Sequence, residues 1–387
     1  MFTNLTFDTV NIIILIILLE IALRFYYFYR RKTLTLFIDS PLLKPDKRTS
    51  KTLLYRNSIF RSYEKKPNIK KGLFISNNNS FGNTEDTSLV KEKNTIRIII
   101  LGGSTVEQKF NENSEVTLSW SELLEIKLKK KYPHTKFEII NSANSGYTVI
   151  DNNLDLLTKC VFFKPDFVFL YASINDAYLQ PHSEFVYDYT HIRKIPNFPN
   201  MIWTEYIPHL KFSYISYYIS ELFMLLSKKI LFLKKKNLFF YTHKNNREFK
   251  SDYSNIEYPI ETFKSYLRSF YGICLANKIV PIFAPWQFNE ELVSNPIKYI
   301  DYDDWDTKAF INLLESNNKS ICDVAKECGE ERGIYLDLFK MEKDCFNSAG
   351  QKNDWQHFSS KGLEKISEDV FQKLISNDLF QNRIIKK

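Results

Sequence analysis

Residues 96–105 have the sequence Ile-Arg-Ile-Ile-Ile-Leu-Gly-Gly-Ser-Thr, which indicates a strand followed by a turn. The run that ends at Leu101 is rich in isoleucine, which is typical of a strand buried on both faces of a parallel sheet. Two glycines follow, and glycine accommodates the tight turn that such a strand needs at its end. The sequence therefore predicts a buried strand with the hydroxyl of Ser104 on the turn that follows it.

Strand-like and helix-like segments alternate from this point on. Four more strands are predicted, at residues 136–141, 167–171, 279–284 and 333–338. Helical patterns lie at residues 119–131, 150–163, 258–277, 305–330 and 360–376. This alternation indicates a parallel sheet with helices on both faces. We therefore predict an α/β fold: a doubly wound, flavodoxin-like three-layer α/β/α sandwich with a five-stranded parallel sheet.

An apolar segment near the N-terminus, residues 11–29, is long enough to cross a bilayer as a helix. Glu20 and Arg24 interrupt it four residues apart, where they can pair on one helix face. Aromatic residues and then a basic run, 30–32, follow it, as at a membrane interface. The segment predicts a single-pass transmembrane helix, and the alternative is a buried or amphipathic helix of a soluble protein. The segment matches the pattern of a cleaved signal peptide less well, because no basic residue precedes the apolar run.

The sequence leaves two orientations possible for the C-terminal part relative to the membrane. Asp8 is the only charged side chain before the apolar run, and basic residues follow it, so the positive-inside rule favours a cytoplasmic C-terminal part. The whole protein is rich in lysine, which weakens that bias.

Composition excludes several classes of protein. The chain has 387 residues, a formal net charge of +8, 44% hydrophobic and 25% charged residues, values typical of a globular protein. The lysines are spread along the chain without a nucleic-acid-binding motif, so we expect no nucleic-acid partner. Five cysteines without a C-x-x-C pair predict neither a disulfide framework nor a zinc module. We expect no metal and no cofactor, and the sequence does not indicate an oligomeric state.

The predicted domain organisation has three parts. Residues 1–32 form the transmembrane anchor with its basic flank, 33–90 a polar tether or peripheral extension, and 91–380 the main domain. A helical insertion at 181–257 interrupts the main domain. Its basic and aromatic segment 210–236 has helical spacing, which is compatible with a helix on a membrane surface, with a lid, or with a helix that packs on the domain.

Polar residues follow the predicted strands at the edge of the sheet where ligands bind in open parallel folds. Ser104 comes after the first strand, Gly146 after the second and Asn175 after the third. Asp354 and His357 lie between the fifth strand and the last helix. We therefore expect these five residues to converge.

The ordered set of motifs across residues 95–376 resembles the SGNH hydrolases, also called GDSL-type esterases and lipases. Each of the family's four motif blocks is unspecific alone, but all four appear in the family order, each after a predicted strand. Two positions depart from the family pattern. Gly103 replaces the aspartate that usually precedes the serine, and Ser173 replaces the glycine two residues before the asparagine. Neither change removes a catalytic group, but both can alter loop geometry.

The resemblance implies roles for the converging residues. Ser104 would be the nucleophile, with His357 and Asp354 completing a catalytic triad. The amides of Ser104 and Gly146 and the side chain of Asn175 would form an oxyanion hole. The physical chemistry agrees, since a serine needs an adjacent imidazole to take its proton, and the imidazole needs a carboxylate to fix its tautomer. Taken singly, Ser104 and Asn175 could instead cap helices, and Gly146 could be only a turn glycine.

The sequence thus predicts a membrane-anchored serine esterase that hydrolyses an O-acyl group, with acetyl as one candidate, on a glycan or lipid-linked substrate. A lipid ester is the second choice. Two alternatives remain open. An acyltransferase would use the same acyl-enzyme with a sugar hydroxyl as acceptor. A non-catalytic ligand-binding module would use residues 102–105 as an anion-binding loop at a helix N-terminus.

Overall fold

The computed structural model describes residues 2–31, 54–58, 61, 63–71, 74–108, 118–189, 215, 251–294, 305–346 and 354–385. The chain divides into two compact units, which are described separately. The first comprises Met1–Asn57 and Lys194–Lys244, and the second Ser58–Arg193 and Asn245–Lys387.

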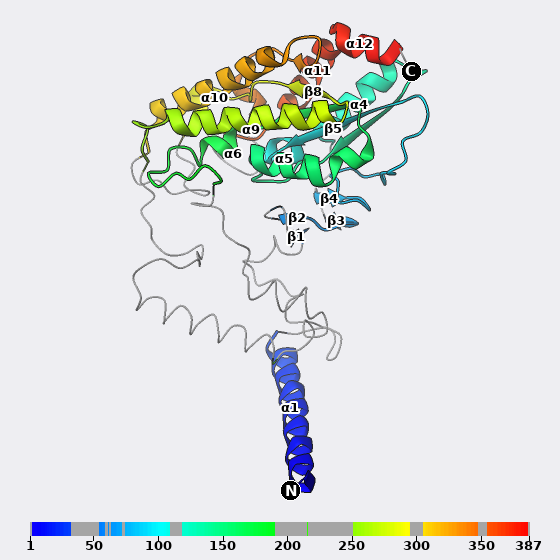
Figure 1. Cartoon of the computed structure of the whole chain (residues 1–387), viewed down its shortest axis with the longest axis vertical. Coiled ribbons are helices and arrows are strands. Elements are labelled where there is room, and N and C mark those ends of the chain that lie inside the picture. Colours follow the sequence, from blue (N-terminus) through cyan, green and yellow to red (C-terminus); the bar gives the residue numbers. More distant parts are fainter. Residues whose placement is uncertain are drawn as a thin grey trace. The chain divides into compact units, whose positions relative to one another are not determined.

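A five-stranded, all-parallel sheet forms the centre of the second unit (Figure 1). Its strands are β5 (Thr95–Gly102), β6 (Lys136–Asn141), β7 (Phe167–Tyr171), β8 (Val280–Phe283) and β9 (Ile334–Tyr335). They lie in the order β6-β5-β7-β8-β9. Numbered along the chain, that order is 2-1-3-4-5, the order of flavodoxin-like doubly wound sheets. The predicted fold class is confirmed.

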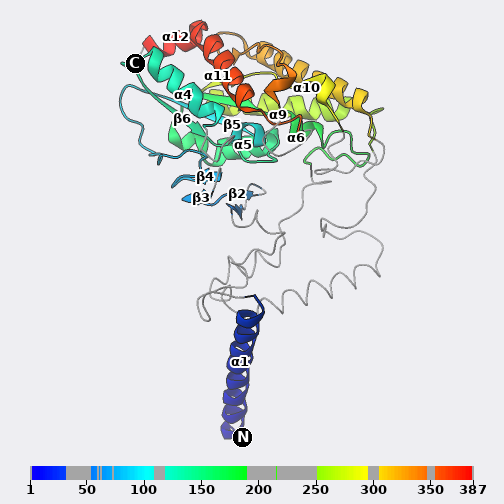
Figure 2. The same cartoon turned by 180° about the vertical axis from the view of Figure 1, so that it is seen from behind.

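Helices cover both faces of this sheet. One side carries α4 (Trp120–Lys131) and α11 (Ser360–Ile375), which are in front in Figure 2. The other side carries α5 (Val149–Thr158) and α9 (Glu257–Ala276), in front in Figure 1, and α10 (Thr307–Cys328) packs against α9. Two cores form because successive side chains of a strand point to opposite faces of the sheet, as β5 shows. Ile98 and Ile100 enter one core, and Ile99 and Leu101 enter the other.

Some elements differ from the sequence-based prediction. The edge strand β9 has two residues where six were expected, because its partner β8 ends at Phe283 and only Ile282 and Phe283 pair with it. The helix expected to reach residue 163 ends at Thr158, and the 3-10 turn η1 (Cys160–Phe163) follows it. A further helix, α12 (Asp378–Ile385), packs Phe380 into the core and was not predicted.

Short elements complete the described structure. Segment 33–90 gave no strand pattern, yet it contains β1 (Tyr55–Asn57), β2 (Tyr63–Lys65) and a hairpin of β3 (Ile69–Lys71) with β4 (Phe74–Ser76). The remaining elements are α3 (Ser104–Glu107), α6 (Ile174–Ala177), η4 (Glu290–Leu292) and η5 (Lys343–Cys345).

The first unit contains one long helix, α1 (Phe2–Arg31). Its stretch Thr9–Tyr26 is long and apolar enough to cross a membrane, judged by length and composition, and none of this stretch is buried. Glu20 and Arg24 pair at 2.9 Å, as their spacing predicts. The basic aromatic segment 210–236 lies outside the described residues except for Ile215, as does most of the predicted insertion 181–257.

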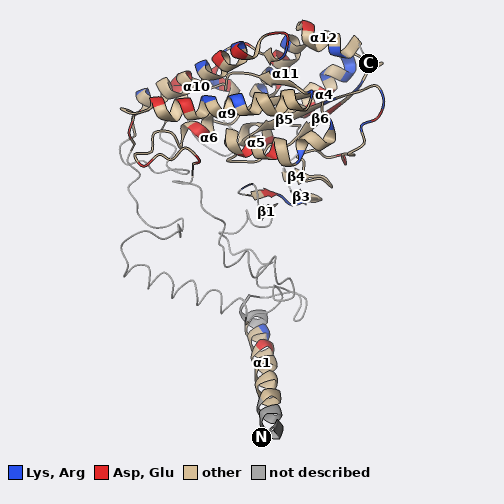
Figure 3. Cartoon of the chain, in the orientation of Figure 1, with Lys and Arg blue, Asp and Glu red and all other residues tan. Residues whose placement is uncertain are grey.

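Charged residues of both signs lie along α9 and α10 (Figure 3). Arg268 of α9 contacts both Glu261 on its own helix and Glu327 on α10, at 2.7 and 2.8 Å. Lys264 of α9 and Lys319 of α10 both contact Asp323 of α10, at 3.6 and 2.7 Å.

Candidate active site

Ser104 is the first residue of α3, and only Gly103 separates it from the end of β5. The turn before it requires glycine because the backbone passes very close to its neighbours. A Cβ on Gly102 would lie 2.5 Å from the carbonyl oxygen of Tyr171 and 2.5 Å from a methyl group of Val106. The absence of that Cβ lets the chain reverse at the strand end and leaves the Ser104 side chain partly exposed.

Ser104, His357 and Asp354 form a continuous hydrogen-bonded chain. The Nε2 atom of His357 lies 2.7 Å from Oγ of Ser104. On the other side of the ring, Nδ1 lies 2.8 Å from Oδ2 and 3.0 Å from Oδ1 of Asp354. The same carboxylate accepts the backbone N–H of His357 at 3.1 Å. Asp354 is nearly buried, with 6% of its side chain exposed, so water competes little for the imidazole.

Two side chains hold the histidine loop in place. Gln108, next to α3, accepts the Phe358 N–H at 3.0 Å and donates its side-chain amide to the Phe358 carbonyl. Trp355 donates its indole N–H to the carbonyl of Ser294 at 3.1 Å and packs within the core. The histidine is thereby fixed from both sides relative to the helix that begins at Ser104.

The Asn175 side chain lies against the turn that carries Ser104. Its Nδ2 donates to the Tyr147 carbonyl at 2.8 Å. A Cβ built on Gly103 would lie 2.5 Å from the same nitrogen, so the amide occupies the space that a side chain at position 103 would need. An amide nitrogen has two hydrogens, and the second remains available for another acceptor.

Gly146 lies in the loop after β6. Its φ of +83° is in the left-handed region that favours glycine. The Asn144 N–H donates to the carbonyl of Gly102 at 3.2 Å, which joins this loop to the serine turn. Within the described residues, neither the Ser104 amide nor the Gly146 amide donates to another backbone carbonyl. The structure thus brings together all five residues expected to converge.

Sequence reasoning missed three residues that border this site: Tyr63, Lys65 and Glu107. Tyr63 donates its hydroxyl to the carbonyl of Ser145, and Lys65 pairs with Glu107 at 3.0 Å. The polar segment that contains Tyr63 and Lys65 has no recognisable motif. Only the position of Glu107, one helical turn after Ser104, could have drawn attention to it.

Two other polar residues near the site, Asp176 and Ser173, are buried. Asp176 is fully buried and accepts the Val149 N–H at 3.2 Å and the Tyr189 hydroxyl at 3.1 Å, contacts that give it a structural role. Ser173 is buried, and its hydroxyl has no hydrogen-bond partner within the described residues.

The remaining histidines do not enter the site where they are described. His134 is exposed, and His182 accepts the Glu184 N–H at 3.0 Å. The other three lie outside the described residues: His191, His209 and His243. In the part of the chain that the structure describes, no group of three histidine, cysteine or acidic side chains could hold a metal ion.

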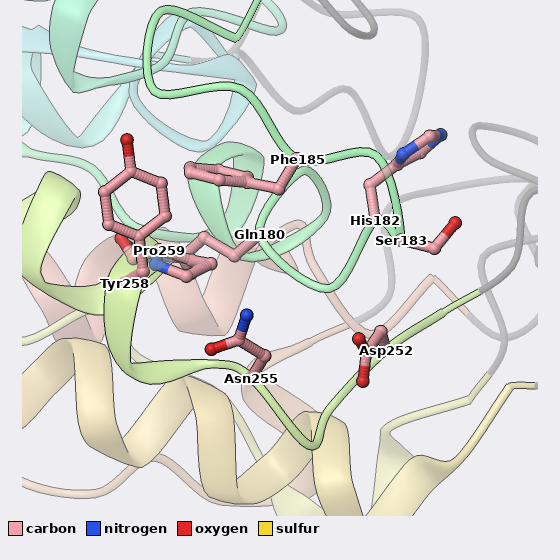
Figure 4. A pocket seen from close by; sticks show the side chains of 8 residues that line it. All are labelled: Gln180, His182, Ser183, Phe185, Asp252, Asn255, Tyr258 and Pro259. Atoms are coloured by element: carbon pink, nitrogen blue, oxygen red, sulfur yellow. Dashed lines mark hydrogen bonds between the residues drawn. The ribbon is translucent and has the colours of Figure 1, made fainter.

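A small cavity of about 90 Å³ lies at the base of the insertion, between the turn after α6 and the start of α9 (Figure 4). Two of its polar side chains, Gln180 and Asp252, are hydrogen-bonded within the protein. Gln180 exchanges two hydrogen bonds with Asn317, and Asp252 accepts from Ser254. None of the residues that line it belongs to the Ser104 site.

The sequence matches no protein-family model and no curated protein. Solved structures are similar to it in fold. An α/β hydrolase, LAE5, from the metagenome of Lake Arreo is 14% identical, with a TM-score of 0.40, covering 74% of this chain and 96% of that one. The acetylxylan esterase Axe2 from Geobacillus stearothermophilus is 13% identical, with a TM-score of 0.40 and coverages of 72% and 93%. A GDSL-like lipase from Parabacteroides merdae is 12% identical, with a TM-score of 0.40 and coverages of 72% and 94%.

Proposed function

We propose that this protein is a serine esterase of the SGNH type that uses Ser104, His357 and Asp354 as its triad. The observation that carries the proposal is the unbroken contact from Asp354 through the imidazole to the serine, with 2.8 Å and 2.7 Å between the paired atoms. The non-catalytic alternative is less well supported, because an anion-binding loop does not need an imidazole and a carboxylate aligned behind its serine.

In the proposed reaction, Nε2 of His357 takes the proton of the Ser104 hydroxyl while Oγ forms a bond to the acyl carbon of the ester. The carbonyl oxygen becomes an oxyanion, which the amides of Ser104 and Gly146 and the side chain of Asn175 stabilise. The bond from the acyl carbon to the alcohol oxygen then breaks, and the alcohol leaves with the proton from His357. Water, deprotonated by the same histidine, then attacks the acyl carbon. The bond from that carbon to Oγ of Ser104 breaks, the acid leaves, and His357 returns the proton to the serine oxygen.

Asp354 supports both proton transfers without losing its charge. Its two oxygens lie on the Nδ1 side of the ring, so Nδ1 carries the hydrogen and Nε2 is free to accept one. The carboxylate also stabilises the imidazolium that forms when His357 takes the serine proton.

The substrate that we propose is an O-acyl ester, such as an acetyl ester, on a glycan or a lipid-linked molecule. We further propose that α1 anchors the protein, since Thr9–Tyr26 is long and apolar enough to cross a bilayer. Resistance of the protein to alkaline extraction of membranes tests the anchor, and reporter fusions at the C-terminus test its sidedness. Release of the protein from membranes by alkali would contradict anchoring.

The catalytic proposal is tested with the full-length protein in detergent and p-nitrophenyl esters of increasing acyl length. Ser104→Ala and His357→Ala should each lower kcat by about 10⁴-fold or more. His134→Ala is the matched control, because His134 is exposed and lies outside the site. Hydrolysis that persists in folded Ser104→Ala would contradict the assignment. A fall in kcat/KM as the acyl chain lengthens would favour acetyl esters.

A further inference from the structure

A buried lysine from the segment before the main domain contacts the loop that carries Gly146. Lys65 of β2 is 1% exposed, and its Nζ donates to the carbonyl of Ala143. The same ammonium lies 3.0 Å from Oε1 of Glu107. A lysine is very rarely buried unless it is paired, so the carboxylate and the carbonyl explain how this one is retained.

Glu107 connects that lysine both to the loop and to the serine helix. Its Oε2 accepts the Ser145 backbone N–H at 2.7 Å and also the Ser145 hydroxyl. Glu107 belongs to the same four-residue helix as Ser104. One carboxylate therefore joins the element that carries the proposed nucleophile to the residue just before Gly146.

Two tyrosines, Tyr63 of β2 and Tyr147 of the loop itself, join the strand to the loop. Tyr63 donates its hydroxyl to the Ser145 carbonyl, and Tyr147 donates its own to the Tyr63 carbonyl. The rings lie 5.5 Å apart between centroids, and a Cβ on Gly146 would lie 2.7 Å from the Tyr63 hydroxyl. Burial raises the pKa of Tyr147 well above its usual value, so this hydroxyl stays a neutral donor.

We propose that Tyr63, Lys65 and Glu107 are positioning residues that set the Gly146 amide at the distance from Ser104 that oxyanion stabilisation needs. The proposal rests on the esterase function above, and it makes β2 part of the active site although β2 precedes the main domain in sequence. Tyr63 contacts the Ser145 carbonyl, which belongs to the same peptide unit as the Gly146 N–H, and Lys65 and Glu107 contact the Ala143 carbonyl and the Ser145 N–H in the two preceding units. These contacts therefore fix the orientation of the donor's own peptide unit and of the two units before it.

The expected effect appears in kcat rather than in KM, because the oxyanion forms only in the transition state. A misplacement of about 1 Å in such a site costs on the order of 100-fold in rate. Removing only one charge of the pair would leave an uncompensated buried charge and could unfold the protein. We therefore choose Tyr63→Phe, which removes one hydroxyl, and the double variant Lys65→Met/Glu107→Met, which removes both charges with little change of volume.

Matched controls are available in the same chain. Tyr271→Phe removes a hydroxyl that donates to the Cys328 carbonyl at 2.9 Å, away from the site. Lys127→Met/Glu368→Met removes an ion pair of 2.8 Å between α4 and α11. Each full-length variant is assayed for p-nitrophenyl acetate hydrolysis and for amide hydrogen exchange of the peptide that spans residues 142–147.

The proposal expects kcat to fall about 10-fold in Tyr63→Phe and about 100-fold in the double variant, with KM changed less than twofold and faster exchange of residues 142–147. The controls should change neither quantity. Unchanged kcat and unchanged exchange in both variants would overturn the proposal. If the folded wild type hydrolyses no ester, the esterase function fails, whereas the exchange measurement still decides whether these residues hold the loop.

Discussion

Replacing Gly103 by alanine adds one methyl group at the position where the resembled family usually has aspartate. The backbone there has φ −97° and ψ −153°, so the left-handed conformations reserved for glycine are not involved. The added Cβ would lie 2.5 Å from Nδ2 of Asn175, against an ordinary contact of 3.4–4 Å. The amide must therefore retreat by roughly 1 Å, which breaks its 2.8 Å bond to the Tyr147 carbonyl.

Asn175 is one of three proposed oxyanion donors, and loss of one donor costs about 100- to 1,000-fold in kcat. We expect about a 100-fold loss in Gly103→Ala, equivalent to about 2.7 kcal/mol of transition-state stabilisation. Gly103→Asp, which restores the usual family residue, should lose at least as much activity because its side chain is larger. The assay is steady-state hydrolysis of p-nitrophenyl acetate, with thermal unfolding measured in parallel.

Gly272→Ala is the matched control, because a Cβ on Gly272 in α9 meets nothing within 4 Å. Alanine in a helix interior stabilises by up to about 1 kcal/mol relative to glycine, so this variant should keep full activity and unfold at a slightly higher temperature. Activity of folded Gly103→Ala within threefold of wild type would refute the placement of Asn175 against the serine turn.

Two further predictions concern stability and reactivity. Ser119→Ala removes the capping box of α4, in which the Ser119 side chain accepts the Glu122 N–H. This variant should lower the free energy of unfolding by about 1 kcal/mol in a urea titration, and an unchanged free energy would contradict the role of the cap. Iodoacetamide at pH 8 should modify Cys322 first in the native protein, because Cys322 is half-buried whereas the other four cysteines are buried and less accessible to the reagent. Burial raises the pKa of the other four thiols: Cys160, Cys274, Cys328 (to about 12) and Cys345. Mass spectrometry of the labelled peptides measures the order, and early labelling of Cys160 would contradict it.

The central sheet could be predicted because its strands are buried on both faces and therefore appear as continuous apolar runs between helical patterns. The edge strand was overestimated, since its length is set by the two β8 residues that pair with it, which only tertiary structure shows. The short strands β2 to β4 gave no periodic signal because three residues are too few to establish one.

The five residues expected to converge could be identified because each follows an element end at one edge of the sheet. Their neighbours could not be identified in the same way. From the sequence, Lys65 would be interpreted as an exposed lysine of a polar segment. In the structure it is buried and contacts Ala143 and Glu107. Asn175 and Gly103 are 72 positions apart in the sequence, so their close approach could not be predicted from it either.

The identity of the nucleophile is tested most directly by mapping the site of covalent modification. The full-length protein in detergent is treated with a fluorophosphonate, and its mass and peptides are then measured by mass spectrometry. The proposed triad predicts one adduct per chain, on Ser104, and its loss in His357→Ala but not in His134→Ala. An adduct on any other residue, or none on a folded protein that hydrolyses p-nitrophenyl acetate, would contradict the assignment of Ser104 as nucleophile.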